Sequence, residues 1–160
     1  AEKNNIQNNH KIDPQERLYP VFMFTEEGAT DVSAYIFPMF GAGLWDWISG
    51  FVAIESDLNT IKGIAFDHKT ETPGLGARIT DAEVQERFAG KKIYNDNDEL
   101  VSVKMLKREG YPDLSPHEVD GLSGATMTAK GVNAMLETYL KCYEGFIKKN
   151  QSESKMALNF

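Results

Sequence analysis

The feature that most constrains the fold is a long stripe of apolar residues toward the C-terminus. The stripe recurs at intervals of three and four residues, which is the period of one face of an α-helix. Its members are Val132, Met135, Leu136, Tyr139, Leu140, Tyr143, Phe146 and Ile147. A helix with such a face has to bury it against a second layer. We therefore expect a helix from about residue 128 to residue 148, and we interpret its stripe as core.

Segments of β-type composition precede this helix and supply the second layer. We expect strands near 18–24, 33–40, 50–55, 60–67 and 100–106. Pro20 and Pro38 indicate strand ends or sheet edges, because proline has no N–H to donate to a neighbouring strand. In the last of these strands, which follows an N-D-N-D turn, Leu100, Val103 and Leu106 are predicted core residues.

A short helix is expected near residues 81–89. Thr80 and Glu83 have the spacing of a capping box, and Ile79 and Val84 occupy the hydrophobic-staple positions around it. The order of elements is then several strands, a short helix, a further strand and a long closing helix. This order predicts an α+β fold with a mostly antiparallel sheet, a short middle helix and a long C-terminal helix.

Composition limits the classes of function. The chain of 160 residues is long enough for one domain with its own core, and its net charge of −7 argues against a nucleic-acid partner. Cys142 is the single cysteine, so no disulfide forms within the chain, and we expect it to pack as a small hydrophobic residue. His10, His68 and His117 share no ligand spacing, so no metal site is predicted. No acid–base or nucleophile–base pair stands out, and no catalytic residue is predicted.

The chain divides into three parts by composition. Residues 1–17 are rich in asparagine without any period, and we interpret them as a mobile leader. Residues 18–150 form the predicted domain, and residues 151–160 a C-terminal tail. No apolar run approaches the roughly 18 residues of a membrane-spanning helix. The chain begins at Ala1 without a methionine, so we expect it to follow a cut upstream of the folded domain.

The stretch D-G-L-S-G-A-T-M-T-A-K-G at 120–131 stands at the expected start of the final helix. Free N–H groups and the positive end of the helix dipole attract anions there, phosphate above all. Gly121 and Gly124 allow a close approach to the backbone, and hydroxyls are available on Ser123, Thr126 and Thr128. An ordinary helix start also fits, with Thr128 as the N-cap.

Neither common nucleotide-binding signature is present. The 120–131 stretch lacks the G-x-x-x-x-G-K-[ST] register of a P-loop. The G-A-G-L-W-D stretch has Asp46 where a dinucleotide-binding fingerprint has its third glycine.

Two loops together resemble a known family. D-G-L-S-G-A-T at 120–126 and E-T-P-G-L-G at 71–76 resemble the FMN-binding domain found in the C subunit of the Na⁺-translocating NADH:quinone reductase and in the G subunit of the related Rnf complex. The resemblance extends over about residues 35–140. G-L-W followed by G-F-V-A-I-E and D-L-N-T favours the quinone-reductase form, with the Rnf form as the alternative. A binding or sensory module outside the cytoplasm that never carries flavin is a third possibility, which the S-G-A-T sequence disfavours.

The resemblance implies which residues hold the cofactor. FMN would be joined through its phosphate to the hydroxyl of Thr126. The residues expected around the phosphate are Ser123, Gly124, Ala125 and Thr128. Those expected beside the ring and ribityl chain are Glu71, Thr72, Pro73, Gly74, Leu75, Gly76 and Trp45. Read without the resemblance, Trp45 and Trp47 also fit a place in the core, and Glu71 fits a local cap.

The resemblance also implies a function and a place in the cell. Electrons from NADH would pass through this subunit toward quinone, in a complex that pumps Na⁺. Its partners would be the other subunits and a flavin transferase that uses FAD. A helix upstream of Ala1 would anchor the domain on the periplasmic side of the inner membrane.

Overall fold

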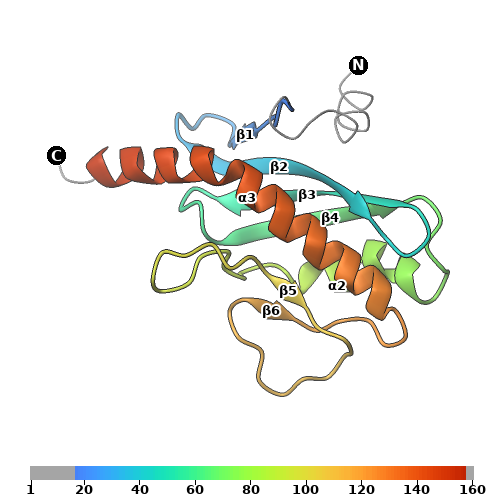
Figure 1. Cartoon of the computed structure of the whole chain (residues 1–160). Helices are drawn as coiled ribbons and strands as arrows, with labels where there is room; N and C mark the ends of the chain where they lie inside the picture. Colours follow the sequence, from blue (N-terminus) through green and yellow to red (C-terminus); the bar gives the residue numbers. More distant parts are fainter. Residues whose placement is uncertain (1–16, 158–160) are drawn as a thin grey trace.

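The computed structural model describes residues 17–157, so all but the last residue of the predicted leader at 1–17 lies outside the described residues. A four-stranded antiparallel sheet in the order β1-β2-β3-β4 forms one layer, and the long helix α3 crosses it (Figure 1). The elements of these two layers are β1 (Phe22–Thr25), β2 (Val32–Ala42), β3 (Trp47–Glu55), β4 (Ile61–His68) and α3 (Thr126–Ala157). The predicted α+β fold with an antiparallel sheet is confirmed.

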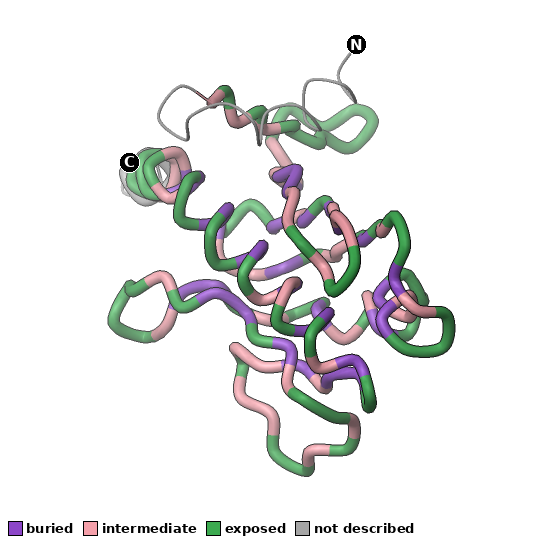
Figure 2. Tube along the Cα trace, turned by 45° about the vertical axis from the view of Figure 1, so that its right-hand side comes forward, coloured by how far each residue is buried: buried purple, intermediate pink, exposed green. Residues whose placement is uncertain are grey.

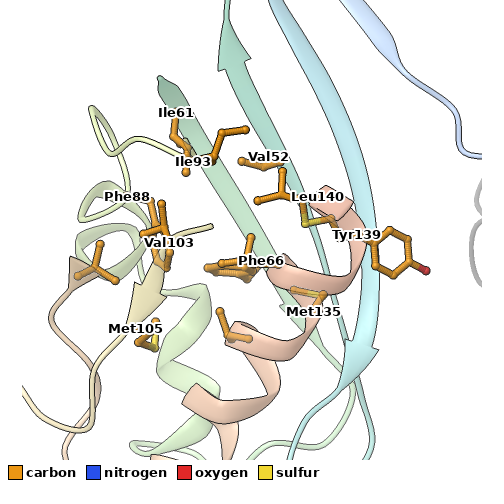
Figure 3. Close-up of a cluster of buried hydrophobic side chains, with 14 of the residues drawn as sticks. Val52, Ile61, Phe66, Phe88, Ile93, Val103, Met105, Met135, Tyr139 and Leu140 are labelled. Atoms are coloured by element: carbon orange, nitrogen blue, oxygen red, sulfur yellow. The ribbon is translucent and has the colours of Figure 1, made fainter. Parts of the chain in front are cut away.

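The core lies between one face of the sheet and α3. Phe37 of β2 pairs with Val52 of β3, which in turn pairs with Ile64 of β4, so one row of side chains points toward the helix. Met135 and Leu140 of α3 are buried against this face (Figure 3). In Figure 2 buried stretches occur along α3 and the strands and in parts of the segment at residues 87–103, whereas the tips of the loops are exposed.

Helix α3 carries the predicted stripe but is longer than expected. It begins at Thr126 and ends at Ala157, so it continues past the predicted end at 148. Every residue of the stripe is buried except Phe146, which is partly buried against the core. The expectation for Cys142 is wrong. Its side chain is exposed, because Tyr139 and Tyr143 take the buried side of that turn.

Strand β2 has a neighbour on both sides only in its first part, and Pro38 lies where one side becomes a sheet edge. The pairing of β1 with β2 reaches only from Val32 to Ile36, and Pro38 lies just beyond it. The hydroxyl of Tyr143 donates to the carbonyl oxygens of Pro38, at 3.0 Å, and of Pro20, at 3.1 Å. Burial raises the pKa of Tyr143, so the phenol keeps its proton. The predicted edge role of Pro38 is therefore confirmed.

The middle helix is shorter than predicted, and its capping differs. A 3₁₀ turn, η1 (Gly76–Thr80), precedes α2 (Ala82–Glu86), and Asp81 is the N-cap residue. The predicted capping box is wrong, because the Thr80 hydroxyl donates back to the Ala77 carbonyl of the 3₁₀ turn, at 2.9 Å. Ile79 and Val84, at the staple positions, are both fully buried.

The predicted strand at 100–106 is largely wrong. Only β5 (Lys104–Met105) forms there, and it pairs in parallel with β6 (Glu118–Val119). Ser102 has a positive φ of 62°, which breaks the extended backbone needed for a longer strand. Val103 is buried as expected, whereas Leu100 and Leu106 are only partly buried.

Candidate functional site

The D-G-L-S-G-A-T segment lies at the start of α3. Ala125 is buried and directly precedes the helix, and Thr126, its first residue, is half-buried. Ser123 and Gly124 are exposed. Gly124 has a positive φ of 81°, a conformation that favours glycine. The Thr126 hydroxyl therefore stands at an open helix N-terminus, beside backbone N–H groups that have no partner within the helix.

Thr128 does not have its predicted role as the N-cap. The helix begins two residues earlier, so Thr128 already lies in its first turn. Its side chain is buried, and its hydroxyl donates to Oε2 of Glu71.

Glu71 is a buried carboxylate that joins three segments, with only 4% of the residue exposed. Oε1 accepts the backbone N–H groups of Leu44, at 2.8 Å, and of Trp45, at 3.1 Å. Oε2 accepts the Thr128 hydroxyl from α3. The alternative of a local cap is wrong, because these partners lie 26 to 57 residues away in the sequence.

Trp45 lies at the surface beside the 71–76 loop. Its residue is 68% exposed, so the alternative that it is a core residue is wrong. The indole Nε1–H donates to the Thr72 hydroxyl at 3.1 Å, which fixes the orientation of the ring. Trp47 behaves differently: it is half-buried and stacks on Phe40, with ring centroids 5.8 Å apart.

The tip of the 71–76 loop reaches the start of α3. Pro73, Gly74 and Leu75 are exposed, whereas Gly76 is buried. Leu75 lies against the loop before the helix, because a Cβ at Gly124 would come within 2.9 Å of Leu75 Cδ2. The structure therefore brings together the predicted residues of both loops and Trp45.

An open pocket of about 680 Å³ borders this site. It lies between the β2–β3 hairpin and α3, and Trp45 contributes to its wall, together with Met135 and Tyr139 from the helix. Most of the lining is apolar, which suits a flat aromatic group better than a charged one.

Two charged residues that hold the 120–126 segment were not predicted. The Asp120 carboxylate accepts the N–H groups of Gly110, at 2.9 Å, and Tyr111, at 3.1 Å. These bonds, together with nearby arginine charges, lower the pKa of Asp120. Arg87 donates to the carbonyl oxygen of Gly121 at 2.8 Å. Asp120 is the first residue of the motif, so the sequence pattern could have identified it as a site residue. No local pattern in the sequence indicates that Arg87 bonds to Gly121, 34 residues away.

Among residues 17–157 there is no group of three or more histidine, cysteine or acidic side chains placed to hold a metal ion. Within the same residues, no helix combines the length and the apolar character that crossing a membrane requires.

The fold and the two adjoining loops define the class of protein. The sequence profile of the FMN-binding domain family matches residues 43–141, a stretch that contains Trp45, the 71–76 loop and the 120–128 segment. The chain belongs to this family.

Within the family, the chain is similar to NqrC, the C subunit of the Na(+)-translocating NADH-quinone reductase. It is 38% identical to that protein of Vibrio alginolyticus over 128 residues, which are 80% of this chain and 49% of the relative. The crystal structure of the C subunit from Parabacteroides distasonis has a TM-score of 0.75 at 41% identity, and the match covers 83% of this chain and 64% of that one. Shewanella oneidensis NqrC has a TM-score of 0.73 at 34% identity, covering 82% and 60%. The chain spans about half the length of the curated relatives it matches.

Proposed function

We propose that this domain is an electron-transfer subunit that carries FMN covalently bound to Thr126. The observation that supports the proposal most is the meeting of three features at one end of the fold. These are the half-buried Thr126 at the start of α3, the exposed Leu75 beside Gly124, and the exposed Trp45. Such a site offers a hydroxyl for attachment, N–H donors for a phosphate and apolar side chains for a ring.

The phosphate end of the cofactor fits the start of α3. Attachment would join Thr126 Oγ1 to the FMN phosphorus of FAD, with cleavage of the pyrophosphate bond and release of AMP and the hydroxyl proton. The first turn of α3 contains no acidic residue, so no side chain of that turn repels the phosphate. The Ser123 hydroxyl and the free N–H groups of the helix are available as donors.

The ring end fits the surface between Trp45 and the 71–76 loop. Trp45 and Leu75 are 68% and 40% exposed. A flat ring packed against them would bury apolar surface of both side chains, which is favourable. Thr72 already orients the indole and lies at the same place. When bound, FMN supplies the redox chemistry, and these residues supply attachment and orientation.

Hydrogen bonding to the flavin is assigned to Thr72 and Ser123 rather than to Glu71. Both carboxylate oxygens of Glu71 already accept hydrogen bonds from protein groups, and the residue is buried. Thr128 is likewise occupied by Glu71. In this proposal Glu71 and Thr128 influence the site through their contacts with the protein and do not touch the flavin.

The similarity to NqrC extends the proposal to the whole protein. We infer a membrane-bound, Na⁺-pumping NADH:quinone oxidoreductase as its complex, with the other subunits as electron donor and acceptor. The G subunit of an Rnf complex is the alternative, and the similarity to NqrC argues against it. The proposal includes an anchoring helix upstream of Ala1, a periplasmic position at the inner membrane, and maturation by a flavin transferase.

The test is expression with and without the flavin transferase. We expect yellow protein with in-gel flavin fluorescence only when the transferase is present. Thr126→Ala should lose both signals, with little change in stability, because the side chain makes no hydrogen bond that the fold requires. Trypsin leaves Thr126 and Thr128 on one peptide, from Glu109 to Lys130, so the modified residue is assigned from fragment ions within that peptide.

Thr25→Ala is the matched control, since it removes an exposed threonine hydroxyl on β1, outside the proposed site, and should keep the covalent flavin. Covalent flavin that survives Thr126→Ala would contradict the assignment of the attachment site. A wild-type protein that stays colourless with an active transferase would favour the flavin-free binding module.

A further inference from the structure

The buried side chain of Glu71 contacts the segments that form the proposed cofactor site but is not exposed on the surface where the flavin would bind. Through Oε1 it holds the N–H groups of Leu44 and Trp45 in the β2–β3 hairpin. Through Oε2 it holds Thr128 in the first turn of α3, the same turn that begins with Thr126. Its own backbone begins the loop that ends at Leu75 and Gly76. One side chain therefore links the ring-binding hairpin, the ring-binding loop and the attachment helix.

Two glycines make room for this carboxylate. A Cβ at Gly43 would lie 2.5 Å from Glu71 Oε1, and a Cβ at Gly76 would lie 2.5 Å from Oε2. Any other residue at either position would push the carboxylate away from its donors. Gly43 of G-A-G-L-W and Gly76 of E-T-P-G-L-G are thus needed to accommodate the Glu71 carboxylate. The carboxylate fills the space between them, so no part of the flavin fits there.

The donors around the carboxylate are neutral. Two backbone amides and one hydroxyl supply its hydrogen bonds, and the first turn of α3 adds the positive end of the helix dipole. Removal of the carboxylate would leave the buried Thr128 hydroxyl and the two part-buried amides without their acceptor, which is costly for each of them. The hairpin and the helix start should therefore loosen together.

We propose that Glu71 is the positioning residue of the flavin-attachment site. It fixes the Thr126 turn relative to the Trp45 hairpin, so that the hydroxyl and the ring-binding surface are presented together to the flavin transferase. This inference rests on the proposed function. It differs from the role that the family resemblance implied, in which Glu71 would contact the flavin itself.

The experiment compares two readouts. In flavin-free protein, amide hydrogen exchange at Leu44 and Trp45 reports the clamp directly. With purified transferase and FAD, the initial rate of covalent flavin incorporation reports the presentation of Thr126. For Glu71→Ala we expect exchange at both amides to be faster, and incorporation slower, by roughly ten-fold or more. Exchange at Ile54 in β3 should stay unchanged.

Conservative variants separate positioning from a general loss of structure. Glu71→Gln keeps an acceptor for the two amides and can donate its amide N–H to the Thr128 hydroxyl oxygen, so it should restore most of both signals. Thr128→Val removes the hydroxyl at nearly constant shape and should slow incorporation, whereas Thr128→Ser should retain it. Thr128→Val also replaces Glu71→Ala as the test if the latter does not fold. Glu55→Ala, which removes an exposed carboxylate, is the control for charge.

The two readouts keep the inference separate from the proposed function. If wild-type protein takes up no flavin, the proposed function fails, and the exchange data alone decide whether Glu71 is a clamp. If wild-type protein is flavinylated and Glu71→Ala takes up flavin at the wild-type rate, the inference is overturned. Unchanged exchange at Leu44 and Trp45 in a folded Glu71→Ala protein would also overturn it.

Discussion

The sheet half of the molecule and the half formed by residues 91–121 are held together by different means. In the sheet half, α3 packs most closely on β2, and buried side chains of β2, β3 and β4 join those of α3 in one apolar core. Within residues 91–121, the only strands are the two-residue β5 and β6, at the lower part of Figure 1. Polar side chains there bond to the backbone of other segments in place of strand neighbours. Burial is shared among many residues, whereas each polar contact depends on a single side chain.

Asn133 and Asn59 show how these contacts work. Asn133 on α3 accepts the N–H of Met105 at 2.8 Å and donates to its carbonyl oxygen at 2.9 Å, as a neighbouring strand would. Asn59, after β3, accepts the N–H groups of Ile93 and Tyr94. The predicted site lies where the two halves meet, since α3 packs on β2 of the sheet and on β5 of the 91–121 segment.

The largest effect is expected from a change in the sheet half. Phe37 is fully buried and packs on Tyr143, with ring centroids 4.8 Å apart. Phe37→Ala should lower the free energy of unfolding by about 3–5 kcal/mol in a urea titration. Phe51, on the outer face of the sheet, is 46% exposed, and Phe51→Ala is the matched control. Equal losses from the two variants would show that the outer face is as important as the core.

A smaller effect is expected from a single polar contact. Asn133→Ala leaves the N–H and carbonyl of Met105 without their partner and should destabilise the protein by about 1–3 kcal/mol. Asn133→Asp keeps the acceptor but loses the donor, so its loss should be intermediate. Amide exchange at Met105 is the local readout. If exchange there does not change in Asn133→Ala, side-chain bonding does not replace strand pairing in this half.

The third effect depends on pH. Hydrogen bonds from the Tyr111 and Gly110 amides lower the pKa of Asp120, and hydrogen bonds from Arg78 and Arg87 lower that of Glu109. A carboxyl whose pKa is lowered in the folded state contributes stability above its unfolded pKa of about 4, and this contribution is lost as pH falls through the folded pKa.

Residues 109–121 should therefore loosen below about pH 4, before the sheet does. An NMR titration of the Gly110 and Tyr111 amides measures this loosening. Asp120→Asn should flatten the pH response of both amides. A sheet that opens at the same pH as the loop would remove the distinction between the two halves.

The smallest effect is expected from an ion pair at the surface of α3, in which the Glu144 side chain is 28% exposed. Lys148 and Glu144 lie one turn apart on α3, with 2.7 Å between Nζ and Oε1. Glu144→Gln should change the free energy of unfolding by no more than about 0.5 kcal/mol, less still at high salt. A loss comparable with that of Asn133→Ala would mean that surface charge is a main source of stability in α3.

The same difference between the halves decides what the sequence could predict. Helix α3 and strands β2 to β4 were predictable, because hydrophobic period follows burial on one face. The strand at 100–106 was not, since its composition is β-like but Ser102 turns the backbone the other way. Contacts such as Asn133 with Met105 join segments that have no common pattern in the sequence.

The candidate site was predictable only in part. The resemblance singled out Thr126 and the 71–76 loop, and the structure brings these segments together with Trp45. The N-cap expected at Thr128 was wrong, because cap propensity is local whereas its partner, Glu71, lies 57 residues away. A local sequence pattern cannot show that a buried carboxylate takes the hydroxyl.

Because Cys142 is exposed, it is a natural labelling position for measuring a distance along α3. Cys142 is the only cysteine in the chain and lies on the open side of the same continuous helix that begins at Thr126. Sixteen helical residues separate the two positions, which corresponds to about 24 Å along the axis. A thiol-linked dye at Cys142 would thus report by energy transfer on a flavin at the far end of α3, without any engineered labelling site.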